Sequence, residues 1–398
     1  MSTHASVHRE VGGPILTPSY RVLLAIAALG GVMMLWRFAA GLAAVSNLND
    51  GYPWGIWIAF DVVTGTALGC GGYAVALLVY ILNKGQYHPL VRPAVLTSAL
   101  GYTMAAIAIN IDVGRTPYIY KIPFMPHWWN LNSVLLEVAL CVMAYVAVLW
   151  FELAPALFET WRKGSSSFFR WLADTFDPII RRLMIPILAI GVLLPTMHQS
   201  SLGALMMLAG NKLHGLWQSP LLPLLFLISC IGMGYAVVVF EAHLSSRAFR
   251  RPSEAPMLAR LGVVTGWITV AYLAIRLGDL VVRGKLGLAF QPSFQALAFW
   301  VEIALFAGAA FLMLSPARRG RAMTQFNAAL MIILAGSLYR IDTYLTGYNP
   351  GDNWSYFPAL PEILITLGIL ALEIMAYLYI VKRYPILAGG SSTAPARA

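Results

Sequence analysis

Charged side chains occur inside long apolar stretches of this sequence, and they are the residues most able to do chemistry. Asp61 lies seven residues into an apolar stretch that starts at Trp54, within the segment GYPWGIWIAFDVVTG. Glu137 and Glu302 occupy similar positions in two later apolar stretches. An ionisable group so deep in a membrane helix usually faces the protein interior or a water-filled cavity. Buried carboxyl groups can bind and release protons, so these residues are candidates for proton transfer.

Other charged residues fall at matching depths, which places positive and negative groups in one layer of the predicted membrane helices. One interpretation is a polar cavity in one half of the membrane, and the other is a set of separate ion pairs and helix caps. A smaller number of carboxyl groups lies at depths towards the opposite membrane surface. These groups could transfer protons or could simply cap helix ends. The layer comprises Arg37, Asp61, Asp112, Glu137, His198, Arg276, Asp279, Glu302, Arg340 and Asp342, and the smaller set comprises Glu373, Glu152 and Glu241.

The sequence lacks the usual signatures of redox metal centres. Cys70, Cys141 and Cys230 each lie alone in an apolar stretch, and no CxxC spacing occurs, so neither an iron–sulfur cluster nor a zinc site is expected. Of seven histidines, only His198 and His243 lie in apolar stretches. They fall at opposite membrane depths, whereas a bis-histidine haem needs two imidazoles at one depth. We therefore expect no haem and no metal site on this chain.

The composition indicates which elements must hold these side chains. The chain has 398 residues, of which 59% are hydrophobic and 11% are charged, and its mean hydropathy is +0.71. A soluble domain has about 25% charged residues, so a soluble protein is excluded and an all-α, polytopic integral membrane protein is predicted. The net charge of +10 is assigned to basic loops at one membrane surface rather than to binding of nucleic acid.

About 20 apolar residues are needed for each membrane crossing, and the sequence contains ten such stretches. We expect residues 1–20 to be an N-terminal tail, 21–385 a single membrane domain and 386–398 a disordered C-terminal tail. The similar segments Glu137–Leu140 and Glu302–Leu305 suggest two parallel four-helix repeats, over 54–208 and 221–345. The ten helices are predicted at 21–45, 54–82, 92–111, 130–153, 182–208, 221–243, 260–281, 294–314, 322–345 and 362–384.

Most of the 27 Lys and Arg residues fall in alternate loops between these helices. The positive-inside rule then places those loops and both termini in the cytoplasm. The opposite, periplasmic loops are rich in aromatic residues and proline, as in YIYKIPFMPHWWN (Tyr118–Asn130) and YNPGDNWSYF (Tyr348–Phe357). A docking surface for a periplasmic partner and a belt of interfacial aromatic residues would each account for this composition.

Seven segments spread over the chain form a recognisable set. They are YPWGIWIAFD (Tyr52–Asp61), NKGQYHPLVRPA (Asn83–Ala94), IDVGR (Ile111–Arg115), LNSVLLE (Leu131–Glu137), FELAPALFE (Phe151–Glu159), LLPTMHQSSLG (Leu193–Gly203) and YFPALPEILI (Tyr356–Ile365). This set resembles the membrane subunit of hydrogenase-2-type periplasmic nickel–iron hydrogenases, within the NrfD/PsrC family of polysulfide reductase membrane subunits. The similarity runs from about Val45 to the end of the last predicted helix.

The resemblance implies a haem-free, quinone-binding subunit in the bacterial inner membrane. It implies a periplasmic ferredoxin-like iron–sulfur subunit as the direct partner, which receives electrons from the small and large hydrogenase subunits. The quinone, menaquinone or ubiquinone, would be reduced near the periplasmic surface, and the whole complex could form a dimer. The acidic residues resembling Glu137 and Glu152 are the family's candidates for proton handling.

Reduction of a quinone by two electrons takes up two protons, so its carbonyl oxygens need hydrogen-bond donors and a supply of protons. We expect His198 or Tyr102 to donate to one carbonyl oxygen. Glu137 would relay protons, and Glu152 would admit them from the cytoplasm. The expected quinone-binding residues are His198, Tyr102, Asp112, Arg115 and Trp54, and the expected proton-transfer residues are Glu137, Glu152 and Asp61.

Other functions are compatible with the same features. A subunit of this kind could serve another periplasmic oxidoreductase, such as a polysulfide, nitrite or molybdenum-containing enzyme. Ten helices, a faint repeat and buried charges are also compatible with a secondary transporter or proton channel, which would work without an iron–sulfur partner. A purely structural membrane anchor would not need a layer of buried charges.

Overall fold

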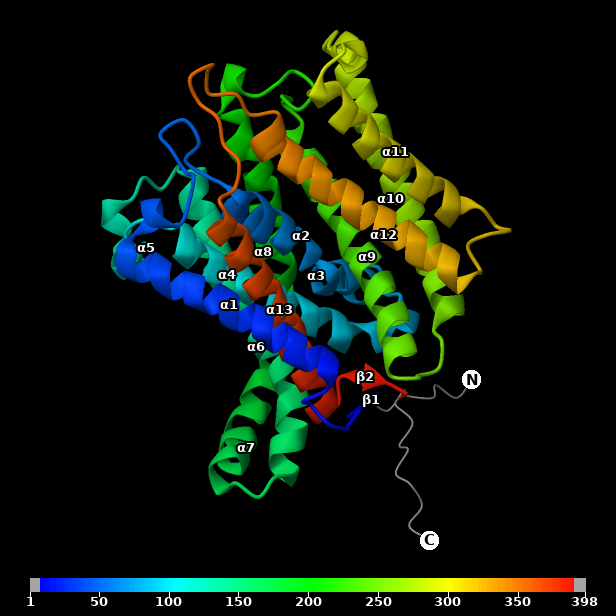
Figure 1. Cartoon of the computed structure of the whole chain (residues 1–398). Helices are drawn as coiled ribbons and strands as arrows, with labels where there is room; N and C mark the ends of the chain where they lie inside the picture. Colours follow the sequence, from blue (N-terminus) through cyan, green and yellow to red (C-terminus); the bar gives the residue numbers. More distant parts are fainter. Residues whose placement is uncertain (1–7, 390–398) are drawn as a thin grey trace.

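The computed structural model describes residues 8–389 and is almost entirely helical (Figure 1). Within this range, ten helical segments are long and apolar enough to cross a membrane, which confirms the predicted all-α, multi-pass architecture. The spans are Pro18–Ala40 (α1), Trp57–Ile81, Gly85–Asp112, Val134–Lys163 (α6), Met184–Met207 (α8), Leu222–Ala248 (α9), Ala255–Val282 (α10), Phe294–Leu314 (α11), Ala322–Thr346 and Leu360–Arg383 (α13).

Three of these spans are composite, and short elements connect the others. The second span contains η2 (Trp57–Thr64), α2 (Gly65–Leu68), α3 (Gly71–Ala76) and η3 (Leu77–Ile81); the third contains η4 (Gly85–Leu90) and α4 (Val91–Asp112); the ninth contains α12 (Ala322–Ile341) and η9 (Asp342–Thr346). The connecting helices are η1 (Leu42–Ala44), η5 (Thr116–Tyr118), α5 (Lys121–Phe124), η6 (Pro126–Trp128), α7 (Ser167–Arg182), η7 (Gly210–Lys212) and η8 (Leu286–Phe290).

Several helices begin where a hydroxyl side chain caps the first free backbone amides. Thr17 accepts from the amide of Tyr20 at the start of α1, and Ser293 accepts from the amide of Ala296 at the start of α11. Ser133 caps α6 in the same way. A hydroxyl at this position replaces the hydrogen-bond partner that the first turn lacks. The predicted start of the fourth helix at residue 130 was therefore four residues too early, because α6 begins only after this cap.

The spans form two groups and a peripheral pair (Figure 1). The second span packs with α4, and α6 packs against both α4 and α8, whereas α9 to α12 pack on one another. The groups meet where α9 contacts α3 and α8. α1 and α13 pair beside them, at a crossing where a Cβ on Gly30 would lie 2.7 Å from the Cα of Gly368. The predicted repeats cover the same stretches of chain as the two groups, and an internal repeat stays a prediction.

The second span is not the single helix expected over 54–82. Its helical backbone begins at Trp57, so Asp61 is its fifth residue and Trp54 precedes it. π-helical turns in η2 and η3 flank a break at Gly69 and Cys70, where the chain turns between α2 and α3. Sequence periodicity could not predict the break, because every residue around it is apolar or small.

The glycines at this break let α4 approach the second span closely. A Cβ at Gly69 would lie 3.0 Å from the ring of Tyr102, and one at Gly72 would lie 2.8 Å from Ser98 Oγ. The amide of Gly72 donates to that same hydroxyl at 2.8 Å. Small residues at helix contacts in membranes have this role, because they allow backbones to come together.

The two ends of the described chain meet in a small clasp. β1 (His8–Arg9) pairs antiparallel with β2 (Leu387–Ala388), and the amides of Val11 and Gly12 donate to carbonyls at the end of α13. We call residues 8–12 and 381–388 the terminal clasp, and the end of the molecule that carries them the clasp face. The opposite end, which carries residues 113–133 and 347–359, is the loop face.

The terminal clasp corrects our expectation of tails at the two ends for the described residues 8–20 and 386–389. Ile386 and Leu387 are buried, and the strand pairing joins segments that are distant in sequence, so local composition gave no indication of it. Residues 1–7 and 390–398 lie outside the described part of the chain.

α6 continues ten residues beyond its predicted end at 153 and forms a hairpin with α7 that projects from the clasp face (Figure 1). Ala173 and Ile180 of α7 pack against Ala154 and Phe158 of α6. Arg162 joins the two helices through Asp174 and Asp177, at 3.0 Å each. We did not predict α7, because its polar residues hide it from a search for long apolar stretches.

Candidate functional site

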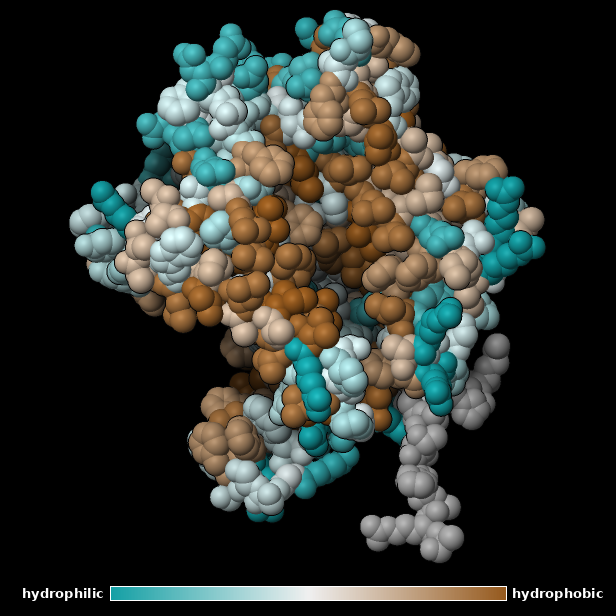
Figure 2. Space-filling model, in the orientation of Figure 1, coloured by the Kyte–Doolittle hydropathy of each residue, from teal (hydrophilic) through white to brown (hydrophobic). Residues whose placement is uncertain are grey.

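The main cavity of the described structure lies between α13 and α9, over the second span and α4. It has a volume of about 540 Å³ and extends from Phe60 and Asp61, towards the loop face, to Ser245 and Phe249, towards the clasp face. We call it the central cavity. Figure 2 shows the apolar surface hollowed between the two groups of helices at this position. Its opening lies among the apolar side chains that face lipid, which suits an apolar ligand that enters from the membrane.

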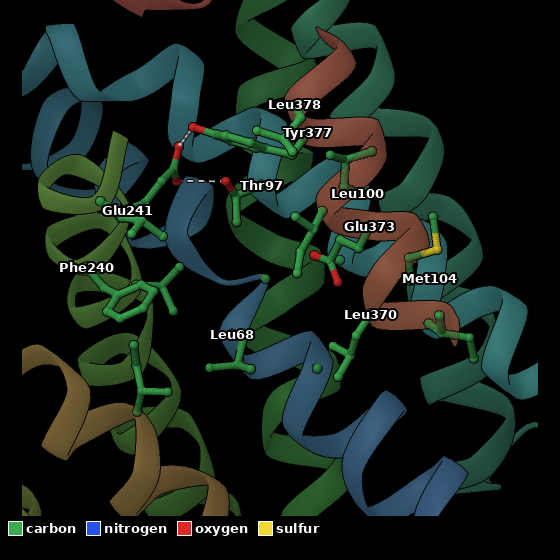
Figure 3. Close-up of a pocket in the computed structure, with 18 of the residues that line it drawn as sticks. Leu68, Thr97, Leu100, Met104, Phe240, Glu241, Leu370, Glu373, Tyr377 and Leu378 are labelled. Atoms are coloured by element: carbon green, nitrogen blue, oxygen red, sulfur yellow. Dashed lines mark hydrogen bonds between the residues drawn. The ribbon is translucent and has the colours of Figure 1, made fainter. Parts of the chain in front are cut away.

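Three carboxyl groups face this otherwise apolar cavity. Oδ2 of Asp61 accepts a hydrogen bond of 2.7 Å from Thr366 Oγ1. Glu241 accepts from Tyr377 at 2.5 Å and from Thr97 at 2.7 Å, as Figure 3 shows. Glu373 points into the cavity (Figure 3), and along α13 it lies between Thr366, which contacts Asp61, and Tyr377, which contacts Glu241. Acidic groups in an apolar cavity are unusual and are typical of a functional site.

A buried polar cluster lies behind the glycine floor of this cavity. Gly65, Gly69 and Gly101 line the floor, and the ring of Tyr102 lies directly beneath Gly69. The Tyr102 hydroxyl lies 3.1 Å from His198 Nε2 and 3.5 Å from Cys70 Sγ. The structure therefore brings together the two residues that we expected to act as quinone donors, although neither lines the cavity itself.

Gln199 connects this pair to a buried cation. Its amide nitrogen donates to Thr66 Oγ1 at 3.0 Å and lies 3.1 Å from His198 Nε2. Its amide oxygen accepts from Arg340 Nη2 at 3.3 Å. Arg340 is completely buried and also donates to Ser229 Oγ at 3.1 Å. We call Tyr102, His198, Gln199 and Arg340 the Tyr102 cluster.

A second buried cluster lies within α9 to α12 and their loops, away from the central cavity. Arg276 Nε and Glu302 Oε1 are 3.8 Å apart, and neither side chain is exposed. Tyr272 donates to Oε1 of Glu302 at 3.0 Å and Trp217 donates to Oε2 at 3.3 Å. We call Arg276, Glu302, Tyr272 and Trp217 the Arg276 cluster. None of its members lines the central cavity.

A third charged group is a helix cap near the loop face. Arg37 donates through Nε to the carbonyl of Ile111 at 2.6 Å and through Nη2 to the carbonyl of Val113 at 2.7 Å. These carbonyls flank Asp112 at the end of α4, so Arg37 closes that helix end. The interpretation of the charged layer as one polar cavity is therefore wrong, because the helices divide the layer into separate clusters. Of its members, Asp61 alone lines the central cavity.

The remaining predicted site residues lie apart from the central cavity. Glu137 is in the first turn of α6 and only partly buried, rather than two turns inside as the predicted helix start implied. Glu152 faces α8 near Gly191, and its buried Oε1 has no hydrogen-bond partner among the described residues. Arg115 is exposed at the loop face, and Trp54 donates to the carbonyl of Tyr344 at 3.1 Å.

Sequence reasoning did not assign Gln199, Thr97, Thr366 and Tyr377 to the site. Gln199 follows His198 directly in the sequence, so an amide beside a membrane-buried imidazole was an available signal. The other three are ordinary residues of apolar helices, and their contacts depend on how those helices rotate against one another. The rotation of one helix against another cannot be predicted from a single sequence.

Comparison with known proteins agrees with these features. The family model described as "Polysulphide reductase, NrfD" matches residues 44–341. The chain is 39% identical to the "Probable Ni/Fe-hydrogenase 2 b-type cytochrome subunit" of Escherichia coli, over 95% of each chain. It is 26% identical to the "Menaquinone reductase, integral membrane subunit" of Nitratidesulfovibrio vulgaris, over 83% of each chain. It is also 25% identical to a subunit of the selenate reductase of Mesobacillus selenatarsenatis, over 34% of this chain and 32% of that one.

The name of the Escherichia coli relative includes a b-type cytochrome, so the histidines were tested against a haem. His198 Nε2 is hydrogen-bonded within the Tyr102 cluster. His243 Nε2 lies 2.8 Å from Gln325 Oε1, near the end of α9 at the clasp face. The two imidazoles point to different partners at opposite depths. They do not fit a haem ligated by two histidines.

Proposed function

The chain belongs to the NrfD family of polysulphide reductase membrane subunits, and from this premise we propose that it reduces quinone in the membrane. It is a membrane subunit of a redox enzyme complex of the bacterial inner membrane. In our proposal, a periplasmic iron–sulfur subunit passes electrons from a nickel–iron hydrogenase to a quinone bound by this chain. The quinone gains two electrons and two protons and leaves as quinol.

The central cavity is the observation that carries this proposal. Its volume of about 540 Å³ and its opening among lipid-facing side chains suit the apolar body and tail of a quinone. Asp61 would face the quinone ring directly, where it can hold a proton for a carbonyl oxygen. The Tyr102 cluster would lie one layer behind, with the thin glycine floor between it and the ring.

Protons would reach this site through the carboxyl groups that face the cavity. Glu241, Glu373 and Asp61 follow one another from the clasp face towards the loop face. We retain Glu137 and Glu152 as proton-handling residues, on the basis of the resemblance. In our proposal, Asp112, Arg115 and Trp54 support the site from the loop face rather than contact the quinone.

The loop face would dock the iron–sulfur partner. Exposed large aromatic side chains gather there, in the segments that the sequence predicts to be periplasmic. Aromatic residues are enriched in the cores of protein interfaces. The exposed residues are Tyr118, Tyr120, Phe124, Trp128, Trp129, Trp354 and Phe357.

The test is hydrogen-dependent quinone reduction by the detergent-purified complex, with an optical spectrum of the same sample. We expect turnover with iron–sulfur absorbance, and haem b bands would contradict the haem-free assignment. Asp61→Asn should lower quinone turnover about hundredfold, because the proton donor nearest the ring is lost. Glu137→Gln should also abolish quinone reduction while the complex still assembles.

Both variants have an internal control, since hydrogen oxidation with a soluble dye bypasses the membrane subunit and should be unchanged. Normal quinone turnover by Asp61→Asn would show that the quinone is not reduced beside Asp61 in the central cavity. Normal turnover by Glu137→Gln would show that Glu137 does not relay protons.

A different oxidoreductase partner is the second candidate function. It is favoured by the similarity to proteins named for menaquinone reductase and selenate reductase. Mass spectrometry of the proteins that copurify with a tagged chain decides between the two. Nickel–iron hydrogenase subunits support the first candidate, and a molybdenum enzyme without them supports the second.

A further inference from the structure

A second, much smaller cavity continues from the central cavity towards the clasp face. Its volume is about 10 Å³, and it shares Glu241 and Ser245 with the central cavity. On its other side it is lined by Arg251, Glu254 and Leu387. A space of this size holds about one water molecule when polar groups surround it. Glu241 therefore lines the same small space as Arg251, Glu254 and Leu387 of the terminal clasp.

Arg251 leaves a hydrogen bond unmade at this position. Its Nη1 donates to Ser245 Oγ at 3.4 Å, and its Nη2 donates to Glu254 Oε1 at 3.3 Å and to the carbonyl of Ala388. Its Nε is buried and has no partner among the described residues. Buried donors without a protein partner are usually satisfied by an ordered water. The small cavity lies beside Arg251, so a water there would accept from Nε and reach the carboxyl group of Glu241.

Glu254 is the outermost member of this series. Its side chain is 22% exposed and forms an ion pair with Arg251, whose own side chain is 5% exposed. Burial raises the pKa of Glu254, and Arg251 acts in the opposite direction. Glu254 thus meets solvent on one side and the small cavity on the other.

We propose that Glu254 takes up protons at the clasp face and passes them through one ordered water to Glu241 and the central cavity. This rests on the proposed function, because only a proton-consuming reaction in the cavity gives the route a use. In each transfer, the O–H bond of protonated Glu254 breaks as the water gains that proton. The water then gives another of its protons to Glu241, and Glu254 is left as a carboxylate that solvent protonates again.

This route differs from the expected uptake at Glu152. Glu152 does not line the central cavity, whereas Glu241 lines both cavities. Arg251 acts as a positioning residue, because it holds the water, Glu254 and the C-terminal strand together.

The experiment uses the whole complex in oriented proteoliposomes, with hydrogen as donor and quinone in the bilayer. The pH is varied from about 6 to about 9 at the clasp face alone and then at the loop face alone. Glu254→Gln should lower turnover about tenfold at the alkaline end and much less at the acid end, because uptake limits turnover where protons are scarce. The loss of turnover should depend on the pH at the clasp face and not on the pH at the loop face. A merely structural defect would lower turnover whichever face is varied.

Two further variants keep this test decisive. Glu254→Asp retains the carboxyl group and should restore most of the turnover. Glu10→Gln changes an exposed carboxyl group within the terminal clasp and should have no effect. If Glu254→Gln keeps the wild-type pH profile at both faces, the route through Glu254 is wrong while the proposed function stands. If the wild-type complex does not reduce quinone, the proposed function fails first.

Discussion

The Tyr102 cluster and the Arg276 cluster are both buried and built from similar residue types, yet they differ in what surrounds them. The Arg276 cluster pairs a full positive with a full negative charge, and neither side chain is exposed. The Tyr102 cluster pairs its buried cation, Arg340, with the neutral amide of Gln199 and lies behind the thin glycine floor of the central cavity. A closed ion pair stabilises one packing of the helices, whereas a polar cluster beside a cavity can act on a ligand. Burial alone therefore does not identify the site.

The largest effect is expected from breaking the closed cluster. Arg276→Ala leaves Glu302 as an uncompensated buried charge, which costs about 3–5 kcal/mol. We expect little folded protein in detergent and a lower melting temperature. Adding Glu302→Gln should recover part of the loss, because the unpaired charge is removed. If Arg276→Ala alone has the wild-type yield and melting temperature, this cluster does not stabilise the packing of α9 to α12.

A smaller effect, on catalysis rather than folding, is expected at the other cluster. Tyr102→Phe removes the hydroxyl that contacts His198 and Cys70. We expect quinone turnover to fall about hundredfold with normal yield, since the cluster behind the glycine floor loses a hydroxyl that can exchange protons. The matched control is Tyr145→Phe. The ring of Tyr145 packs edge-on against that of Tyr102, with the ring centroids 4.5 Å apart. Equal losses for both variants would indicate a packing role for this pair.

The smallest effect is expected from narrowing the cavity. Leu370→Trp places a larger side chain at a position that lines the central cavity. We expect the KM for quinone to rise about tenfold while kcat changes little, since ground-state binding is impaired. Leu367→Trp on the same helix makes the same change at a position that is 44% exposed and does not line the cavity. An unchanged KM for Leu370→Trp would place the quinone elsewhere.

The sequence was sufficient to predict the ten spans, because a membrane crossing requires a long apolar stretch whatever its neighbours are. Two of these predictions, 294–314 and 322–345, agree with the structure to within one residue. α7 and the terminal clasp were missed because neither contains a long apolar stretch, and both depend on contacts with another part of the chain. The first is held by its polar contacts with α6, and the second by pairing between segments from the two ends of the chain.

The site was predictable in part. Tyr102 and His198 were predicted as alternative donors to one quinone carbonyl, and they lie in contact. Depth along a helix follows from residue number, so the sequence can group charges by predicted depth, although Glu137 lies nearer the start of its helix than we predicted. Which charges meet depends on helix rotation and neighbours, and this is why the sequence left open whether Arg276, Arg340 and Arg37 share one cavity or belong to the separate clusters that the structure shows. The central cavity depends on the same packing.

The contact between Gly30 and Gly368 has a consequence for how the protein is made. Chains emerge from the ribosome N-terminus first, so α1 is synthesised long before α13. The surface of α1 around Gly30 stays uncovered until the last span arrives, and β1 likewise waits for β2. A product that stops before Leu360 can form neither contact and presents an unpaired first helix to membrane proteases. The pairing of α1 with α13 therefore reports whether synthesis has passed α13.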